Sequence, residues 1–198
     1  MREGVKLAVV LLIICAVSSG LLGLTNDFTQ PQILARRAQS EAEAKAVVMP
    51  QADDISQSVD EETFNAVLDE LMLTSETLNQ AYIAKQQDAV IGYVFECTVK
   101  GFGGDIKVMV GVNIEGTVSG VKVTSHSETV GLGSKATDEE WVSQFNGLSA
   151  ASDVQVVKTE NRGDNEITAI TGATITSRAV VSAVNYALQA FTIINGGL

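Results

Sequence analysis

The most apolar stretch of the chain is its beginning. Twenty residues without a charged side chain lie between Lys6 and Asp27. As an α-helix at ~1.5 Å per residue this stretch reaches ~30 Å, which matches the hydrocarbon thickness of a bilayer. Arg2 and Lys6 precede it. By the positive-inside rule, residues 1–26 are predicted to be a single-pass anchor in the cell membrane with a cytoplasmic N-terminus, which places the rest of the chain on the extracytoplasmic face.

A cleaved secretory signal is the alternative interpretation of the same segment. The small residues of AVSSG follow a shorter apolar run, as they would before a cleavage site. Apolar residues resume at Leu21, Leu22 and Leu24, beyond that site. This continuation favours a retained anchor, and either interpretation exports the remainder of the chain.

The periodicity of the remaining chain divides it into a stalk and a compact domain. Residues 27–59 are predicted to be a helical stalk and linker, because Ala, Gln and Glu dominate until Pro50 and the polar residues after it. Apolar residues at helical spacing follow in 62–73. The compact domain is therefore predicted to span residues 60–198.

Within that domain the hydrophobic period changes to two. Alternating stretches at 81–86, 90–101, 106–113 and 117–127 predict two β-hairpins, and 153–159 and 165–170 predict two further strands. A short helix is expected at 141–148, and a long amphipathic helix runs from about 173 to 194. The predicted fold class is α+β, with a mainly antiparallel twisted sheet and flanking helices.

Composition and charge narrow the chemistry. The formal net charge of −11 opposes binding to phosphate backbones, so the sequence predicts no nucleic-acid partner. Two cysteines and one histidine offer neither a disulfide framework nor a ligand set for zinc or an iron–sulfur cluster. No metal is predicted, and any redox chemistry must come from an organic cofactor.

The segment TGATITS at 171–177 is the sharpest candidate for a binding site. It lies where a predicted strand turns into the C-terminal helix, and the first turn of a helix offers unpaired N–H groups and a positive dipole end. That arrangement suits a phosphate, with hydroxyl groups nearby. A plain N-cap threonine, which needs no ligand, is the competing interpretation.

Two further glycine-rich segments accompany it, GFGGD at 101–105 and SETVGLGSK at 127–135. Both are compatible with ordinary loops. Leu132, presented between two glycines, could instead cover a flat ring. His126 and Trp141 are interpreted as a strand-end residue and a core residue, so no catalytic residue is predicted.

These segments resemble, in the same order, the motifs of the FMN-binding domains in the RnfG and NqrC subunits of membrane redox complexes. TGATITS is similar to the flavinylation motif and SETVGLGSK to the loop ETPGLG, and the strands before that loop are also similar. The resemblance covers residues 5–195. Val130 stands where the family usually has Pro, and Thr168 where it usually has Asp.

The resemblance implies a set of site residues. Thr174 would carry FMN through a phosphoester between its hydroxyl and the FMN phosphate, attached from FAD by a separate flavin transferase. The residues implied around the isoalloxazine and ribityl chain are Glu128, Thr129, Gly131, Leu132, Gly133 and Lys135. Those implied around the phosphate are Thr171, Gly172, Ala173, Thr176 and Ser177.

The implied function is electron transfer. The chain would be a flavoprotein subunit of an ion-translocating ferredoxin:NAD⁺ oxidoreductase (Rnf) complex, whose partners are membrane lipid and other membrane and redox subunits. Three alternatives are kept: an NqrC-type subunit of a sodium-pumping NADH:quinone oxidoreductase, a free-standing exported FMN carrier, and an anchored binding module without flavin.

The anchor prediction can be tested on the mature protein. N-terminal sequencing of the chain purified from membranes should return the residues that follow the initiator methionine, because the apolar run continues past the small residues AVSSG. A mature chain beginning shortly after residue 18 would contradict the retained anchor.

Overall fold

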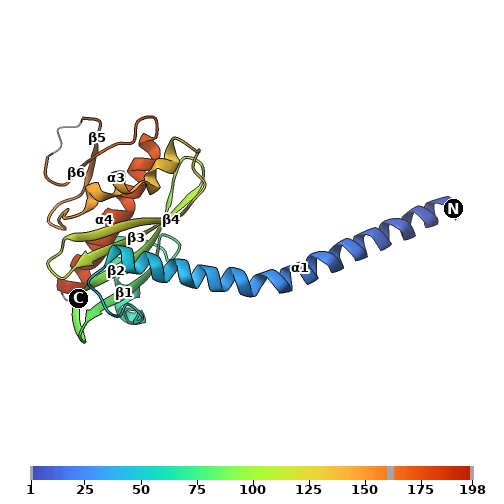
Figure 1. Ribbon diagram of the computed structural model, residues 1–198, viewed down its shortest axis with the longest axis horizontal. Helices are drawn as coiled ribbons and strands as arrows, with labels where there is room; N and C mark the ends of the chain where they lie inside the picture. The colour runs from blue at the N-terminus through green and yellow to red at the C-terminus, as the bar shows by residue number, and fades with distance from the viewer. Residues whose placement is uncertain (1, 160–162, 197–198) are drawn as a thin grey trace. The chain divides into compact units, whose positions relative to one another are not determined.

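The computed structural model describes residues 2–159 and 163–196. The chain divides into two units, one ending at Glu41 and a compact one beginning at Ala42. The outer limits of the predicted anchor and compact domain, residues 1 and 198, lie outside the described residues. Figure 1 gives the course of the chain through its helices and strands.

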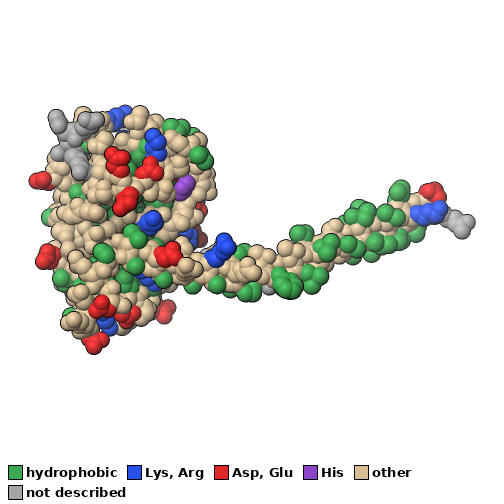
Figure 2. Space-filling model, in the orientation of Figure 1, with side chains coloured by type: hydrophobic (Ala, Val, Ile, Leu, Met, Phe, Trp, Pro, Cys, Tyr) green, Lys and Arg blue, Asp and Glu red, His purple; other side chains and the backbone are tan. Residues whose placement is uncertain are grey.

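The first helix, α1 (Arg2–Val48), runs through both the predicted anchor and the predicted stalk, with Pro31 inside it. From Glu3 onward it is long and apolar enough to cross a membrane, and its most apolar stretch has no buried residue. Figure 2 shows apolar side chains along its N-terminal half. The C-terminal helix α4 (Thr174–Gly196) meets the same criteria of length and composition, but half of its apolar window is buried, as in the core helix of a folded domain.

The compact unit is built on a four-stranded antiparallel meander, in the order β1-β2-β3-β4. The strands are β1 (Leu78–Gln86), β2 (Ala89–Lys100), β3 (Asp105–Asn113) and β4 (Val118–His126). Gln87 and Asp88 join β1 to β2 with positive φ angles, as a two-residue hairpin turn requires. Both predicted hairpins are therefore confirmed.

One face of the sheet is covered by α4, which contacts β2 and β3, and α4 is also in contact with α2 (Glu61–Leu71). Phe95, Val108 and Val110 point into this main core. Asp60 begins α2 as its N-cap, because its carboxylate accepts a hydrogen bond from the Thr63 N–H at 2.9 Å. The α+β class with an antiparallel sheet is confirmed.

The opposite face of the sheet is covered by the end of α1. Val94 and Met109 alternate with the main-core residues of their strands and pack with Val48 and Met49 in a second buried cluster. The domain was predicted to begin at residue 60. The compact unit instead includes residues 42–59, because the end of α1 supplies apolar contacts that the sheet would otherwise expose to water.

Residues 49–59, predicted as a linker, lie along β1. The Lys85 N–H donates to the Asp54 carbonyl at 2.9 Å, and the Val59 N–H donates to the Ala81 carbonyl at 2.8 Å. The segment therefore covers the free edge of β1, which would otherwise expose unpaired N–H and C=O groups. The polar composition predicted a linker because this pairing is made mainly by backbone atoms, together with side-chain hydrogen bonds from the Lys85 ammonium to Gln57 and from the Gln87 N–H to Asp53.

The remaining elements surround the start of α4. They are a 3₁₀ turn at Gly133–Thr137, α3 (Glu139–Val142), a second 3₁₀ turn at Ser143–Phe145, β5 (Gln155–Val157) and β6 (Glu166–Thr168). β5 and β6 pair in parallel, apart from the main sheet. Trp141 and Phe145 are buried and their rings meet edge to face, which confirms Trp141 as a core residue.

Gly120 provides a test of how α1 is seated on the sheet. A Cβ at this position would lie 2.9 Å from the Val48 Cα and 3.0 Å from the Val48 carbonyl oxygen. Gly120→Val should therefore displace the end of α1 and destabilise the domain by about 1–3 kcal/mol. Urea unfolding of the full chain in detergent measures the loss, and faster tryptic cleavage after Lys45 reports the displaced helix.

Ser125→Val, at an exposed position of the same strand, is the matched control. It should leave both measurements unchanged. Equal stability and equal cleavage rates for Gly120→Val and wild type would contradict this account of the helix seat.

Candidate functional site

The turn before α4 is held by hydrogen bonds at both ends. The Ser177 hydroxyl donates to the Ala173 carbonyl at 3.0 Å and accepts from the Ile170 N–H at 2.9 Å. Gly172 has a φ of +79°, and a Cβ there would lie 3.2 Å from Leu132 Cδ2. The positive φ therefore favours glycine at the centre of the turn, and a side chain there would also require a small shift of Leu132.

The strand that leads into this turn is also fixed. The Trp141 indole N–H donates to the Thr168 carbonyl at 2.9 Å, and the Thr168 N–H donates to the Gln144 side-chain oxygen at 2.9 Å. The α3 region thus holds the end of β6. The first turn of α4 starts from a rigid base and contains no acidic residue that would occupy its N–H groups.

A cavity of about 420 Å³ opens beside this helix start. Three segments far apart in the sequence form it: the tip of the β2–β3 hairpin, the loop after β4, and the first turn of α4. Its lining residues are Phe102, Glu128, Thr129, Leu132, Gly133, Gly172, Ala173, Thr174, Ile175 and Thr176. Its size falls within the ~300–1,000 Å³ typical of small-molecule sites.

Eight of the twelve site residues implied by sequence line this cavity, and four do not. Ser177 is fully buried under the turn, and Thr171, Gly131 and Lys135 are exposed. Gly131 has a φ of +79° and closes that loop by donating its N–H to the Ser134 hydroxyl. These four residues therefore lie near the cavity in sequence, and none of them forms its wall.

Two lining residues were not predicted. Phe102 stands at the tip of the β2–β3 hairpin and is 71% exposed, and Ile175 is 55% exposed on the first turn of α4. The glycine-rich segment 101–105 was noted, but nothing in its pattern distinguishes an aromatic ring on a cavity wall from one on an ordinary turn. Nothing in the sequence around Ile175 distinguishes it as a residue that lines a cavity.

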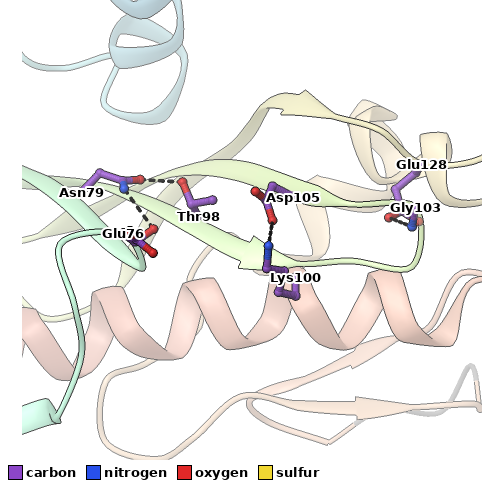
Figure 3. A network of polar contacts seen from close by, with 7 residues as sticks. All are labelled: Glu76, Asn79, Thr98, Lys100, Gly103, Asp105 and Glu128. Atoms are coloured by element: carbon purple, nitrogen blue, oxygen red, sulfur yellow. Dashed lines mark hydrogen bonds and ion pairs between the residues drawn. The ribbon is translucent and has the colours of Figure 1, made fainter.

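Glu128 joins the three segments. It is 7% exposed, and its carboxylate accepts a hydrogen bond from the Gly103 N–H at 2.9 Å and from the Thr176 hydroxyl at 2.6 Å. Figure 3 shows Glu128 and Gly103 at the hairpin tip, past the Lys100–Asp105 ion pair. A Cβ on Gly101 or Gly133 would collide with the carboxylate oxygens, so these glycines leave room for it.

The environment of Glu128 favours its charged form. Burial alone raises the pKa of this carboxyl, but the Thr176 hydroxyl and the N–H groups of Gly103 and Phe102, together with nearby His126, bring the pKa below its ordinary value. His126, the last residue of β4, accepts a hydrogen bond from the Glu128 N–H through Nδ1 at 3.2 Å. Glu128 is therefore a carboxylate at neutral pH.

A second cavity, of about 390 Å³, lies between the ends of β1–β3 and the middle of α4. Its lining includes Glu76, Thr98, Lys100 and Asp105. The Lys100 Nζ lies 2.5 Å from the Asp105 Oδ1. Two of the charged groups of this cavity, Lys100 and Asp105, thus bind each other, and Asp105 is the only one of its described lining residues that belongs to a glycine-rich segment. The cavity at the start of α4 is therefore the better candidate.

Residues 101–189 match the family model described as the FMN-binding domain. These residues include the hairpin tip, the loop after β4 and the start of α4. The three segments that line the cavity therefore all fall within the part of the chain that characterises the family.

Comparison with known proteins gives the particular family. The chain is 37% identical to the G subunit of the Na⁺-translocating ferredoxin:NAD⁺ oxidoreductase complex of Acetobacterium woodii, covering 94% of this chain and 90% of that protein. It is 34% identical to the G subunit of the ion-translocating oxidoreductase complex of Methanosarcina acetivorans, covering 95% and 94%. The chain belongs to the family of G subunits of ion-translocating oxidoreductase complexes.

A solved structure has the same fold. The crystal structure of the C subunit of the Na⁺-translocating NADH-quinone reductase from Parabacteroides distasonis aligns with a TM-score of 0.52 at 21% identity. The alignment covers 60% of this chain and 63% of that one.

Removing the Thr176 hydroxyl tests the Glu128 network. Because the folded-state pKa of Glu128 is lowered, the stability it contributes is present above the unfolded-state pKa and is lost as the pH falls through the folded-state pKa. Thr176→Val should cost about 1–3 kcal/mol at neutral pH. The cost should shrink at pH ~3.5, below the ordinary glutamate pKa of ~4.3. Urea unfolding of flavin-free protein at both pH values measures this.

Thr192→Val is the matched control. The Thr192 hydroxyl donates to the Leu188 carbonyl within the same helix and touches no carboxylate. Its effect should be the same at both pH values. A cost for Thr176→Val that did not depend on pH would contradict the assigned charge of Glu128.

Proposed function

We propose that this chain is the electron-transfer flavoprotein subunit of an ion-translocating ferredoxin:NAD⁺ oxidoreductase complex and that Thr174 holds its FMN covalently. FMN binding follows from the family match. The two relatives above are both named as G subunits, which favours this assignment over the NqrC type. When bound, FMN supplies the electron chemistry, and the chain supplies position and environment.

The observation that carries the Thr174 proposal is the state of the hydroxyl groups around the cavity. The Thr176 hydroxyl donates to Glu128, and the Ser177 hydroxyl bridges Ala173 and Ile170. Thr174 lines the cavity, is partly exposed, and makes no side-chain hydrogen bond to the described residues. Thr129 is the other lining hydroxyl without a side-chain hydrogen bond to the described residues, but it lies on the loop after β4. Thr174 is therefore the lining hydroxyl best placed at the helix start to react with a phosphate.

The residues present fit a flavin phosphate. Thr174 is the first residue of α4, where free N–H groups and the positive end of the helix dipole stabilise an anion. Gly172 and Ala173 add little side-chain bulk to the approach to these N–H groups. Phe102, Leu132 and Ile175 provide apolar surface for a ring in the same cavity.

Attachment would form one bond and break another. The Thr174 oxygen bonds to the phosphorus of the FMN half of FAD, the pyrophosphate P–O bond breaks, AMP leaves, and the hydroxyl proton is released. A separate flavin transferase is the proposed partner for this step. The exposure of Thr171, Gly172 and Ile175 leaves the turn accessible to such an enzyme.

We further propose that α1 anchors the protein in the cell membrane as a single pass, next to membrane lipid and the other membrane and redox subunits. Its uncharged run and the preceding Lys6 favour a cytoplasmic N-terminus and an extracytoplasmic FMN-binding domain.

The Thr174 assignment is tested by comparing hydroxyl variants co-produced with the flavin transferase. Thr174→Ala should fold and lose covalent flavin, whereas Thr174→Ser, which keeps a hydroxyl, should retain it. Thr176→Ala should remain flavinylated because its hydroxyl serves Glu128. Flavin fluorescence of the denatured chain on a gel is the measurement. Fluorescence in Thr174→Ala combined with none in Thr176→Ala would show that the acceptor is wrongly assigned.

A further inference from the structure

The cavity wall carries a single ionisable side chain. Of the ten described residues that line it, the others are apolar, glycine or threonine, and only Glu128 titrates. Among the described residues no Lys or Arg forms a salt bridge with Glu128. Its hydrogen-bond donors are neutral dipoles, so its negative charge is stabilised without being cancelled.

The basic side chains nearby do not line the cavity. Lys100 is paired with Asp105 at the second cavity, and Lys135 is exposed and does not line the first. His126 accepts the Glu128 N–H through Nδ1 and is not among the residues that line the cavity. Among the described lining residues, the Glu128 carboxylate is therefore the one charged side chain, and its charge is negative.

We propose that Glu128 is the fixed negative charge that lowers the midpoint potential of the flavin held in this cavity, an inference that rests on the proposed function. Reduction adds two electrons and one proton to the isoalloxazine, which leaves one negative charge on the ring. A carboxylate on the wall of a partly enclosed cavity raises the energy of that charge more than the same carboxylate would in water. The oxidised, neutral ring has no such cost.

Glu128 and the proposed attachment point belong to the same cavity. Thr174 and Thr176 both line it, and the Thr176 hydroxyl donates to the Glu128 carboxylate. A flavin attached at Thr174 and held in this cavity would therefore lie against the wall that carries Glu128.

Glu128→Gln is the direct test because it removes the charge and keeps the hydrogen bonds. The glutamine oxygen can accept from the Gly103 N–H, and its amide can donate to the Thr176 hydroxyl. Asp105→Asn removes a carboxylate from the same hairpin outside the cavity and is the matched control. The full chains are co-produced with the flavin transferase and purified in detergent. Intact-mass spectrometry then shows what fraction of each chain carries covalent FMN.

The midpoint potential is then measured by titration with dithionite, which supplies the two electrons and is oxidised to bisulfite. We expect an upward shift in Glu128→Gln and none in Asp105→Asn. A flavinylated Glu128→Gln with the potential of wild type would overturn the proposal. Wild-type chain without covalent flavin would instead overturn the proposed attachment, which the mass measurement detects separately.

Leu132→Asp tests the same electrostatics without touching the bonds of Glu128, should Glu128→Gln not fold. Leu132 lines the cavity and is 45% exposed, so the variant adds a second carboxylate to the wall. Its midpoint potential should fall while Thr174 stays flavinylated. An unchanged potential in a flavinylated Leu132→Asp would also overturn the proposal, because a carboxylate on this wall would then have no effect on the flavin.

Discussion

The site depends on one requirement, that a carboxylate buried in protein must be fully hydrogen-bonded. Glu128 meets it by drawing together the hairpin tip at Gly103 and the first turn of α4 at Thr176. Among the described residues, this carboxylate makes the side-chain hydrogen bonds that join the three segments around the cavity. The Glu128 carboxylate is also the charged side chain among the described lining residues. One group therefore both joins the segments and sets the charge of the cavity.

The sheet provides the rigid frame for this junction. Both of its faces are covered, by α4 on one side and by the end of α1 on the other, and its β1 edge is covered by residues 49–59. The end of α1 fits because Gly111 and Gly120, paired across β3 and β4, leave no side chain in its way. The last turn of α1 is thereby part of the compact unit that begins at Ala42.

Hydrophobic periodicity was sufficient to predict the two hairpins, α4 and the α+β class, because each has a buried face of clear period. The turn at Gly172 could be predicted from glycine and threonine at a helix start. Other features could not. The pairing of residues 49–59 with β1 is made mainly by backbone atoms, and Phe102 looks like any turn residue. The absence of Lys135 from the cavity lining depends on a loop geometry that its sequence does not specify.

The central claim is that Thr174, at the start of α4 and on the wall of the cavity, carries the flavin. Tandem mass spectrometry of the tryptic peptide spanning residues 163–178, prepared from protein in its native membrane, tests this most directly. The predicted result is the added mass of FMN on Thr174. Fragment ions that place the mass on Thr171 or Thr176, or a peptide without it in a flavin-containing membrane, would contradict the claim.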